Sequence, residues 1–333
     1  MRPRVFITQP VARSAIDRLR QVAEVRLNPD PLHIASKDEL LAAVREHDVL
    51  FCLLHDRVDC DVIAANPRLR AIASMKITPS DIDVAEATAR RIPITVITPM
   101  VGEATADIAW ALLLAVARRL VEGDRFVRAG VFPGSQSSYL EGSGVSGKVL
   151  GLIGGGGRIG RAVARRAQGF SMRILYWGPR RKPESDEREL GLTYVPFDRL
   201  LAESDFVSLH TPLTPETRHQ IGARELGLMK PTAFLINTSR GAIVDEPALA
   251  RALAERRIAG AGLDVFENEP HVEPALLAMP NVVLTPHLGS AVTQLREAMA
   301  NIVVDNILAI LEGRQPPNCW NPEIYATQVP AKS

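Results

Sequence analysis

Short apolar runs alternate with stretches of helical periodicity along almost the whole of this 333-residue chain. The runs have the length of buried strands, and strands that follow one another through helices lie parallel in a sheet with helices on both faces. The alternation therefore predicts an α/β fold built on parallel sheets. The expected strands are residues 5–8, 49–54, 71–73, 94–96, 149–153, 172–177, 206–210, 233–237, 262–265 and 282–285.

Two such series are separated by a long apolar helix and a loop. The helix begins near Glu103 and is apolar nearly all round over 108–117, so it must be buried between domains or in a subunit interface. The loop over 132–144 is rich in Gly and Ser. A last helix, over about 291–311, is expected to return to the first series. We therefore expect two domains, residues 1–100 plus 288–333 and residues 101–287.

The charge of the chain is balanced, with 39 basic and 38 acidic residues, which argues against a nucleic-acid or anionic-membrane partner. Cys52, Cys60 and Cys319 have no zinc spacing, and their odd number argues against a disulfide framework. The start lacks signal-peptide features, and the longest apolar stretch is too short to span a bilayer. We expect a cytoplasmic protein that needs no metal and binds small molecules or other subunits.

A glycine-rich turn joins the first strand of the second series to a helix that begins at Arg158. Gly155, Gly157 and Gly160 have the GxGxxG spacing, which allows a tight turn, close approach of the backbone to a pyrophosphate and close packing of helix on strand. The phosphates would lie at the helix N-terminus. Gly154 adds a fourth consecutive glycine, so the turn is expected to be looser than usual. The context predicts a dinucleotide site, and a bare glycine loop is the alternative.

The next strand ends at Trp177 without the acid that would accept hydrogen bonds from the adenosine ribose of NAD. Arg180, Arg181 and Lys182 follow shortly after it. Three cations in place of a carboxylate suit a 2′-phosphate, so the sequence favours NADP over NAD. The alternative is a solvated basic loop.

Three late segments each close on a reactive side chain. Arg240 precedes a glycine, and its guanidinium could bind a substrate carboxylate through two hydrogen bonds and polarise the neighbouring carbonyl. His287 follows a proline and could exchange a proton near neutrality. Glu269 could fix the tautomer of such a histidine and stabilise its imidazolium. Each residue alone fits a loop or cap, but together they predict a hydride-transfer site acting on a 2-oxo acid.

These segments resemble the D-isomer-specific 2-hydroxyacid dehydrogenases, most closely the glyoxylate/hydroxypyruvate reductase branch. The resemblance covers nearly the whole chain, and its most specific parts are residues 105–119, 157–160, 204–217, 228–245, 259–270 and 285–290. It implies two lobes, a Rossmann dinucleotide-binding domain and a flavodoxin-like substrate (catalytic) domain, with the active-site cleft between them. It also implies a homodimer built largely on the cofactor domain, which the long apolar helix is consistent with.

The resemblance assigns roles to individual residues. By it, Arg240 binds the substrate carboxylate, His287 is the acid/base and Glu269 is its partner. Asp264 is implied to hold the nicotinamide amide, and Thr105 to approach the nicotinamide end. The other residues expected at the cofactor are Gly155, Gly157, Arg158, Ile159, Arg180, Arg181, His210, Thr211, Pro212, Thr217 and Thr238.

One loop of the first domain departs from the family pattern. Relatives have Val-Gly followed by an aromatic residue, and their backbone N–H groups hold the substrate carboxylate; here Ile77, Thr78 and Pro79 take these places. Losing the glycine removes access to positive φ, and the proline pushes Thr78 toward extended conformations. Lys76 either pairs with a second anionic group of the substrate or is a solvated lysine. His55 lies either near the substrate or in a plain surface turn.

The sequence therefore predicts an NAD(P)-dependent D-2-hydroxyacid dehydrogenase that interconverts a small 2-oxo acid and its D-2-hydroxy acid. The altered loop leaves open a dehydrogenase of an unusual anion, such as phosphite or a di-acid. Some members of the fold family act as transcriptional corepressors, so an NAD(P)-sensing binding protein is a third hypothesis. The presence of all three reactive residues argues against it.

Overall fold

The computed structural model describes residues 2–326, and the chain forms two units. Unit 1 comprises the described residues up to Met100 and from Val292 onward, and unit 2 comprises Val101–Ala291. The last long helix, α13 (Thr293–Leu311), belongs to unit 1. The chain leaves unit 2 after Ala291 and not after His287, because the two residues following His287 are hydrogen-bonded to Asp264 inside unit 2.

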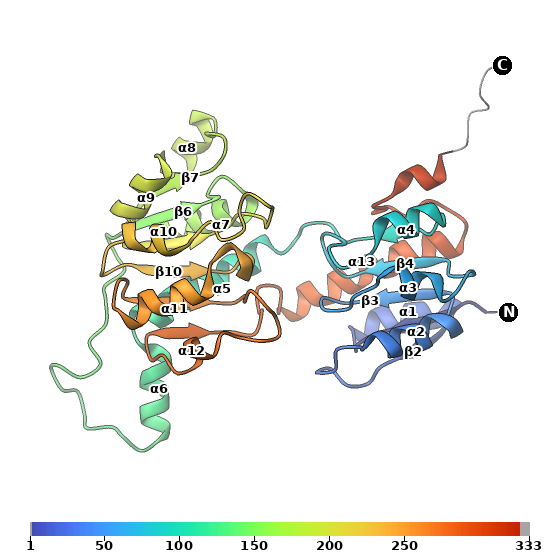
Figure 1. The fold of residues 1–333 in the computed structure, drawn as a ribbon, viewed down its shortest axis with the longest axis horizontal. Helices are drawn as coiled ribbons and strands as arrows, with labels where there is room; N and C mark the ends of the chain where they lie inside the picture. Colours follow the sequence, from blue (N-terminus) through green and yellow to red (C-terminus); the bar gives the residue numbers. More distant parts are fainter. Residues whose placement is uncertain (1, 327–333) are drawn as a thin grey trace. The chain divides into compact units, whose positions relative to one another are not determined.

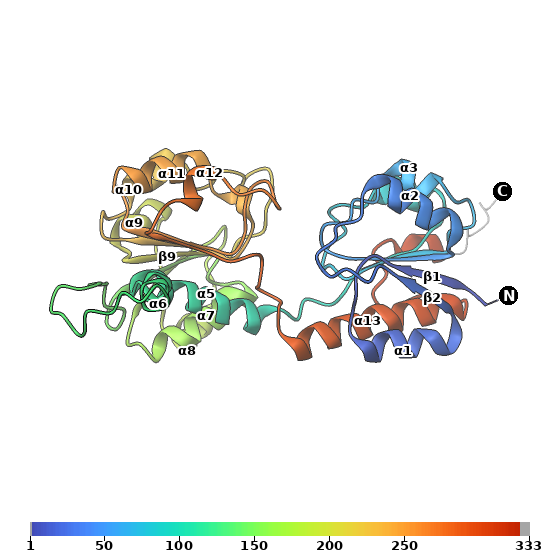
Figure 2. The same cartoon turned by 90° about the horizontal axis from the view of Figure 1, so that it is seen from below.

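Unit 1 contains a parallel five-stranded sheet in the order β2-β1-β3-β4-β5. This strand order is the flavodoxin-like one. The strands are β1 (Arg4–Ile7), β2 (Glu24–Leu27), β3 (Val49–Cys52), β4 (Ala71–Ser74) and β5 (Ile94–Thr95). Figure 2 shows α1 and α13 on one face of the sheet and α2 and α3 on the other. The other helices of unit 1 are α1 (Arg13–Val22), α2 (Lys37–Glu46), α3 (Cys60–Ala64) and α4 (Val84–Ala89). A short 3-10 helix, η2 (Pro322–Tyr325), lies near the end of the described residues.

Strand β2 and helix α2 are absent from the elements expected from the sequence. Strand β2 lies at the edge of the sheet, and its residues are half-buried or exposed, so it lacks the apolar run of a buried strand. Helix α2 does carry a sequence signal, because Ser36 and Glu39 form a capping box at its start.

Unit 2 contains a parallel seven-stranded sheet in the order β12-β11-β10-β9-β6-β7-β8. Counted from β6, this is the Rossmann order with one more strand at the far edge. The strands are β6 (Val149–Ile153), β7 (Arg173–Trp177), β8 (Leu192–Tyr194), β9 (Phe206–Leu209), β10 (Phe234–Asn237), β11 (Gly260–Leu263) and β12 (Val282–Leu284).

Helices cover both faces of this sheet, with α5 and α7 on one side and α9 to α12 on the other (Figure 2). Each side has its own apolar core. The helices are α5 (Gly102–Ala117), α6 (Leu120–Arg128), α7 (Arg158–Gln168), α8 (Glu184–Leu190), α9 (Phe197–Glu203), α10 (Ala223–Leu228), α11 (Glu246–Ala254) and α12 (Pro274–Leu277), with a 3-10 turn η1 (Gly241–Ile243) before α11.

The apolar helix α5 is buried inside unit 2, so its composition does not by itself require a subunit interface. Leu112 and Leu113 belong to the core on its side of the sheet. Trp110 stacks on Phe170 and donates its indole N–H to the Val163 carbonyl at 3.1 Å. Within residues 2–326, no helix is long and apolar enough to cross a membrane.

Candidate active site

The predicted site segments of unit 2 all follow strands of one sheet. The glycine turn follows β6, His210 follows β9, Arg240 lies beyond β10, Asp264 follows β11 and His287 lies beyond β12. Because these strands are parallel, their last residues lie at one edge, which we call the carboxyl edge. Ligands of such sheets bind outside this edge, where the strand order reverses. That reversal falls between β6 and β9. In Figure 1, β7 lies on one side of β6 and β10 on the other.

Glu269 and His287 form a hydrogen-bonded pair. The Nδ1 atom of His287 lies 2.9 Å from Oε2 of Glu269, while Oε1 of Glu269 accepts a hydrogen bond from Phe266 N at 3.0 Å. An ionised carboxylate can only accept, so the arrangement places the proton of a neutral imidazole on Nδ1. The Nε2 atom is then the one that can exchange a proton with a substrate.

The loop carrying His287 is anchored by Asp264, which is 1% exposed. One carboxylate oxygen accepts from Thr285 Oγ1 at 2.7 Å and from Leu288 N at 2.6 Å, and the other accepts from Gly289 N at 2.8 Å. His287 itself has φ +54°, a left-handed conformation that a non-glycine residue keeps only where its surroundings enforce it. Asp264, expected at the nicotinamide amide, therefore also fixes the backbone of the histidine loop.

Thr105, expected near the nicotinamide end, contacts the same loop. Its Oγ1 donates to the carbonyl of Gly289 at 3.1 Å. Helix α5 thus holds the histidine loop from a third direction.

Arg240 is exposed beyond β10, and its backbone is fixed by Asn237. Asn237 Nδ2 donates to the carbonyl of Arg240 at 3.0 Å, and its Oδ1 accepts from Ser239 N at 3.0 Å. Of the guanidinium donors, NH1 binds the Ser239 carbonyl at 2.7 Å, and the others make no hydrogen bond within residues 2–326. A fork with free donors can still bind an anion.

The glycine after Arg240 explains how the arginine and glutamate segments come together. A Cβ atom at Gly241 would overlap the carbonyl carbon and oxygen of Phe266 and the nitrogen of Glu267. The turn that presents Glu269 therefore packs directly on the backbone beside Arg240. Sequence reasoning noted the glycine as a neighbour of Arg240 but could not find this contact.

The glycine turn is closed rather than loose. Gly154 has φ +83°, and a Cβ there would lie 2.6 Å from the carbonyl oxygen of His210. Gly157 N donates to the carbonyl of Gly154 at 2.9 Å. A Cβ at Gly160 would lie 2.6 Å from Gly155 Cα, so helix α7 packs against the turn. The expectation of a looser turn is wrong, because the additional glycine lets the turn pack on the end of β9.

Three polar atoms in the segments after β9 and β10 are buried without a hydrogen-bond partner in the described part of the chain. They are His210 Nδ1, Thr211 Oγ1 and Thr238 Oγ1. Burial lowers the pKa of His210 to about 3, so its ring is neutral. Buried polar groups without partners cost free energy unless a ligand or water satisfies them. These residues were expected at the cofactor, and their unsatisfied atoms fit a polar ligand there.

Other residues expected at the cofactor lie in the segments that follow β6 and β9. Arg158 begins α7, and Ile159 packs against the core beneath it. The Pro212 carbonyl accepts a hydrogen bond from Thr217 Oγ1 at 2.7 Å, which closes the loop after β9.

In the basic segment after β7, Arg181 and Lys182 make different contacts. Arg181 forms two hydrogen bonds with Glu187, at 2.9 and 2.7 Å, and Tyr176 donates to the same carboxylate at 2.7 Å. Hydrogen bonds from Arg181 and Tyr176 lower the pKa of Glu187 to about 2. The alkyl chain of Lys182 occupies the space where a Cβ on Gly156 would lie. Arg181 is thus engaged by Glu187, which sequence reasoning missed, whereas Lys182 covers the glycine turn.

In unit 1, the altered loop follows β4. The ammonium group of Lys76 pairs with Asp81, which the sequence analysis did not identify as its partner. The backbone N–H groups of Ile77 and Thr78 make no hydrogen bond within residues 2–326, so they remain available to an anion. No residue of the 75–83 loop has a positive φ.

A buried carboxyl group lies beside this loop. Asp56 is 2% exposed and accepts hydrogen bonds from Thr8 Oγ1 and, at 2.7 Å, from Leu53 N. Burial raises the pKa of Asp56, and the nearby charge of Lys76 opposes that rise. His55 is exposed in the turn after β3.

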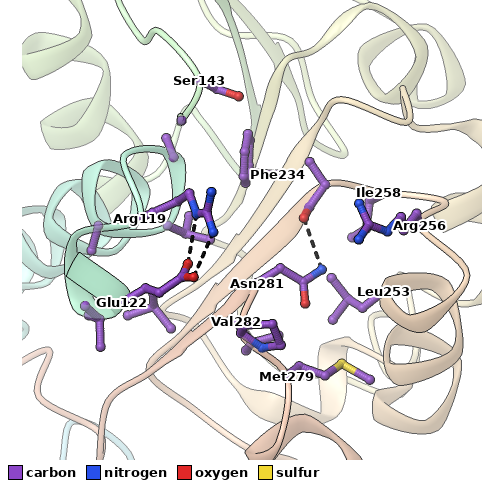
Figure 3. Close-up of a pocket in the computed structure, with 18 of the residues that line it drawn as sticks. Arg119, Glu122, Ser143, Phe234, Leu253, Arg256, Ile258, Met279, Asn281 and Val282 are labelled. Atoms are coloured by element: carbon purple, nitrogen blue, oxygen red, sulfur yellow. Dashed lines mark hydrogen bonds and ion pairs between the residues drawn. The ribbon is translucent and has the colours of Figure 1, made fainter. Parts of the chain in front are cut away.

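A cavity of about 960 Å³ lies at the opposite edge of the unit 2 sheet, where β10, β11 and β12 begin (Figure 3). Its apolar lining includes Leu253, Ile258 and Met279. Arg119 and Glu122, which also line the cavity, form a bidentate ion pair with hydrogen bonds of 2.8 and 2.7 Å. The cavity contains none of the predicted catalytic or cofactor residues.

Comparison with known proteins is consistent with this geometry. The family model described as "D-isomer specific 2-hydroxyacid dehydrogenase, NAD binding domain" matches residues 110–289. A glyoxylate reductase of Thermococcus litoralis is 48% identical over 334 aligned positions, which cover 99% of this chain and all of that protein.

Solved structures match over similar lengths. A crystal structure of a protein from Thermus thermophilus is 43% identical, with a TM-score of 0.88 over 95% of this chain and 99% of that one. The NADPH-dependent glyoxylate/hydroxypyruvate reductase of Sinorhizobium meliloti, solved with NADP and malonate, is 32% identical, with a TM-score of 0.77 over 96% and 97%.

Proposed function

Because this chain belongs to the D-isomer specific 2-hydroxyacid dehydrogenase family, we propose that it reduces glyoxylate, hydroxypyruvate or a similarly small 2-oxo acid with NAD(P)H. The observation that carries the proposal is the Glu269–His287 pair, held at the carboxyl edge by Asp264, with the free guanidinium donors of Arg240 beyond β10 of the same sheet. Several relatives of similar length and 45–48% identity are named glyoxylate reductases, which supports the substrate class.

The residues of unit 2 divide the chemistry between them. A bound nicotinamide dinucleotide supplies the hydride. Arg240 binds the substrate carboxylate and orients the carbonyl group next to it. His287 donates the proton from Nε2 to the carbonyl oxygen, and Glu269 stabilises the imidazolium through Nδ1. Asp264 keeps the histidine loop in the conformation that this proton transfer needs.

The cofactor preference is proposed to be NADP over NAD. Strand β7 ends without an acid, and Arg180 and Lys182 supply positive charge beyond it. Arg181 uses two of its N–H donors on Glu187, and the remaining donors of its guanidinium can bind the 2′-phosphate. The pKa of Glu187 lies well below its ordinary range, so this carboxylate stays ionised and keeps its hold on Arg181 at neutral pH. The relative solved with NADP supports the same preference.

The substrate is proposed to carry one anionic group. A second anionic group would need a free cation in the 75–83 loop, but Lys76 is paired with Asp81. This pairing argues against a di-acid or phosphite, which the altered loop had left open. The N–H groups of Ile77 and Thr78 can bind a single carboxylate.

The protein is also proposed to be a cytoplasmic homodimer. Helix α6 buries none of its residues, and Leu120, Val127, Val131 and Phe132 are exposed large apolar side chains on it and just after it. The apolar cavity at the amino ends of β10 to β12 offers a second copy a surface of matching character (Figure 3). The exposed free thiol of Cys60 fits a reducing compartment.

The proposed function is tested by following NADPH and NADH consumption with glyoxylate, hydroxypyruvate, a larger 2-oxo acid and a 2-oxo di-acid. Phosphite is tested in the oxidative direction. Turnover is expected with the small 2-oxo acids, with a lower KM for NADPH than for NADH. Turnover with phosphite and with none of the 2-oxo acids would show that the substrate is an inorganic anion and not a 2-oxo acid. Tight nucleotide binding without turnover on any substrate would favour an NAD(P)-sensing protein.

A further inference from the structure

The turn that carries Glu269 is held by a carboxyl group that belongs to none of the predicted site segments. Glu246, the first residue of α11, is 4% exposed, and its Oε1 accepts a hydrogen bond from Glu267 N at 2.7 Å. One residue earlier, Phe266 N donates to Glu269 at 3.0 Å. Two successive N–H groups therefore donate to two different carboxyl groups, one on α11 and one on the turn itself.

Helix α11 does not need Glu246 in order to begin. Asp245 is its N-cap and accepts a hydrogen bond from Ala248 N at 2.9 Å, and a proline follows Glu246 in the first turn. Burying a carboxyl group costs free energy unless hydrogen bonds compensate. The contact with Glu267 N is therefore the feature that distinguishes this buried group from an ordinary helix residue.

The same turn is fixed from two further directions. Arg218 and His219 lie 2.6 and 2.7 Å from Oε1 of Glu267. Gly241 leaves no space between its own Cα and the Phe266–Glu267 peptide. Glu267 is thus held at both its N–H and its carboxylate, and it lies two residues before Glu269 in the same turn.

We propose that Glu246 is a positioning residue for the acid/base pair, because its hydrogen bond to Glu267 N keeps Glu269 on Nδ1 of His287. The inference rests on the proposed function for its effect on turnover, but the contacts that it invokes do not. Burial raises the pKa of Glu246, the hydrogen bond from Glu267 N opposes that rise, and the facing carboxylates of Glu267, Glu273 and Glu269 add to it.

The test compares two replacements of Glu246 that differ in one property. Glu246→Gln keeps an oxygen that can accept from Glu267 N, whereas Glu246→Leu fills similar space without an acceptor. Glu273→Gln is the control, because it removes a facing carboxylate without touching Glu267 N. If Glu246→Leu does not give a folded protein by circular dichroism, Glu246→Ala takes its place.

Two experiments are done on each variant. The first measures kcat and KM with glyoxylate and NADPH, and the second measures the midpoint of the His287 ring titration by NMR, assigned with His287→Gln. Glu246→Leu is expected to lower kcat about 10- to 100-fold, as a misplaced catalytic group does, with an unchanged KM for NADPH. Its titration midpoint is expected to fall below that of Glu246→Gln, while Glu246→Gln and Glu273→Gln show only the smaller effect of lost charge.

Equal kcat values and equal midpoints for Glu246→Leu and Glu246→Gln would overturn the inference. The midpoint needs no turnover. A wild-type protein that is inactive on every 2-oxo acid would therefore reject the proposed function, while the NMR comparison would still decide the role of Glu246.

Discussion

His287 and Arg240 are both fixed through their backbones, which leaves their reactive atoms free. Asp264 accepts three hydrogen bonds from the 285–289 loop and so enforces the left-handed backbone of His287. Asn237 holds the carbonyl of Arg240 in the same way. At the scale of the residue, the site is therefore preorganised by buried amide and carboxyl groups, and the Arg240 guanidinium and the Nε2 atom of His287 remain available to a ligand.

Replacing Arg240 by lysine tests the two-pronged binding of the substrate carboxylate. Lysine keeps the charge but loses the planar fork, so kcat/KM for glyoxylate is expected to fall about 10- to 100-fold. Steady-state kinetics with Arg224→Lys as control is the measurement, because Arg224 is an exposed arginine paired with Asp198. An Arg240→Lys enzyme as efficient as the wild type would refute the role.

Replacing Glu187 by glutamine tests the Arg181–Glu187 ion pair after β7, through the pH dependence of the free energy of unfolding. The folded state lowers the pKa of Glu187 from an ordinary 4.5 to about 2. The stabilisation is therefore fully present above the ordinary value and is lost as the pH falls toward 2. Urea unfolding should show Glu187→Gln less stable than wild type at neutral pH, with the gap closing in acid. The exposed Glu184→Gln variant should show a much smaller gap, and a Glu187→Gln gap independent of pH would contradict the assignment.

At the scale of the element, the site is assembled where parallel strands end and where loops from different strands touch. Gly241 lies against the Phe266–Glu267 peptide, and Gly154 lies against the end of β9. Each glycine joins two loops that are far apart along the chain. These contacts couple the arginine loop to the glutamate loop and the glycine turn to the strand beside it.

Gly241→Ala is the sharpest test of this coupling. A Cβ there overlaps the Phe266–Glu267 peptide, so the Glu269 turn must move, and both stability and kcat are expected to fall. The control is Gly227→Ala in α10, where nothing lies within 4 Å of the added Cβ. That variant is expected to be neutral or stabilised by about 0.5–1 kcal/mol. Thermal unfolding and kcat are measured together, and equal behaviour of the two variants would refute the coupling.

The sequence predicts the elements with a clear apolar pattern and misses those whose stability depends on context. All the strands of unit 2 except β8 were expected, because each is an apolar run between turns. Strand β8, like β2, lies at an edge of the sheet and includes exposed residues, so its apolar pattern is weak. Arg240, Glu269 and His287 were also predicted from the sequence as site residues, and their roles stay predictions. The partners Glu187, Asp81 and Glu246 were not predicted, because nothing local to the chain shows which charges meet after folding.

At the scale of the whole molecule, unit 2 carries the reactive trio at one edge of its sheet and an apolar cavity at the other. This separation lets a second copy cover the amino edge without blocking the carboxyl edge. In the proposed dimer, the interface therefore does not include the predicted catalytic residues.

Phe132→Glu tests the dimer. The side chain is 70% exposed after α6, so a charge there should leave the fold intact and weaken association. Light scattering after size exclusion is expected to give a dimer for the wild type and a larger monomer fraction for the variant. Leu32→Glu, at an 88% exposed apolar position in unit 1, should remain dimeric. A monomeric wild type would contradict the proposal.

In the proposed reaction, the imidazole of His287, supported by Glu269, transfers the proton during reduction of a small 2-oxo acid. This proton transfer is tested by the rate of NADPH oxidation with glyoxylate by wild type, His287→Ala and His271→Ala, with NADPH affinity measured by fluorescence. We expect a loss of about 10²- to 10⁴-fold in kcat for His287→Ala with unchanged NADPH affinity, and near wild-type rates for His271→Ala, whose side chain is exposed. A His287→Ala enzyme that turns over glyoxylate at the wild-type rate would contradict this role of His287.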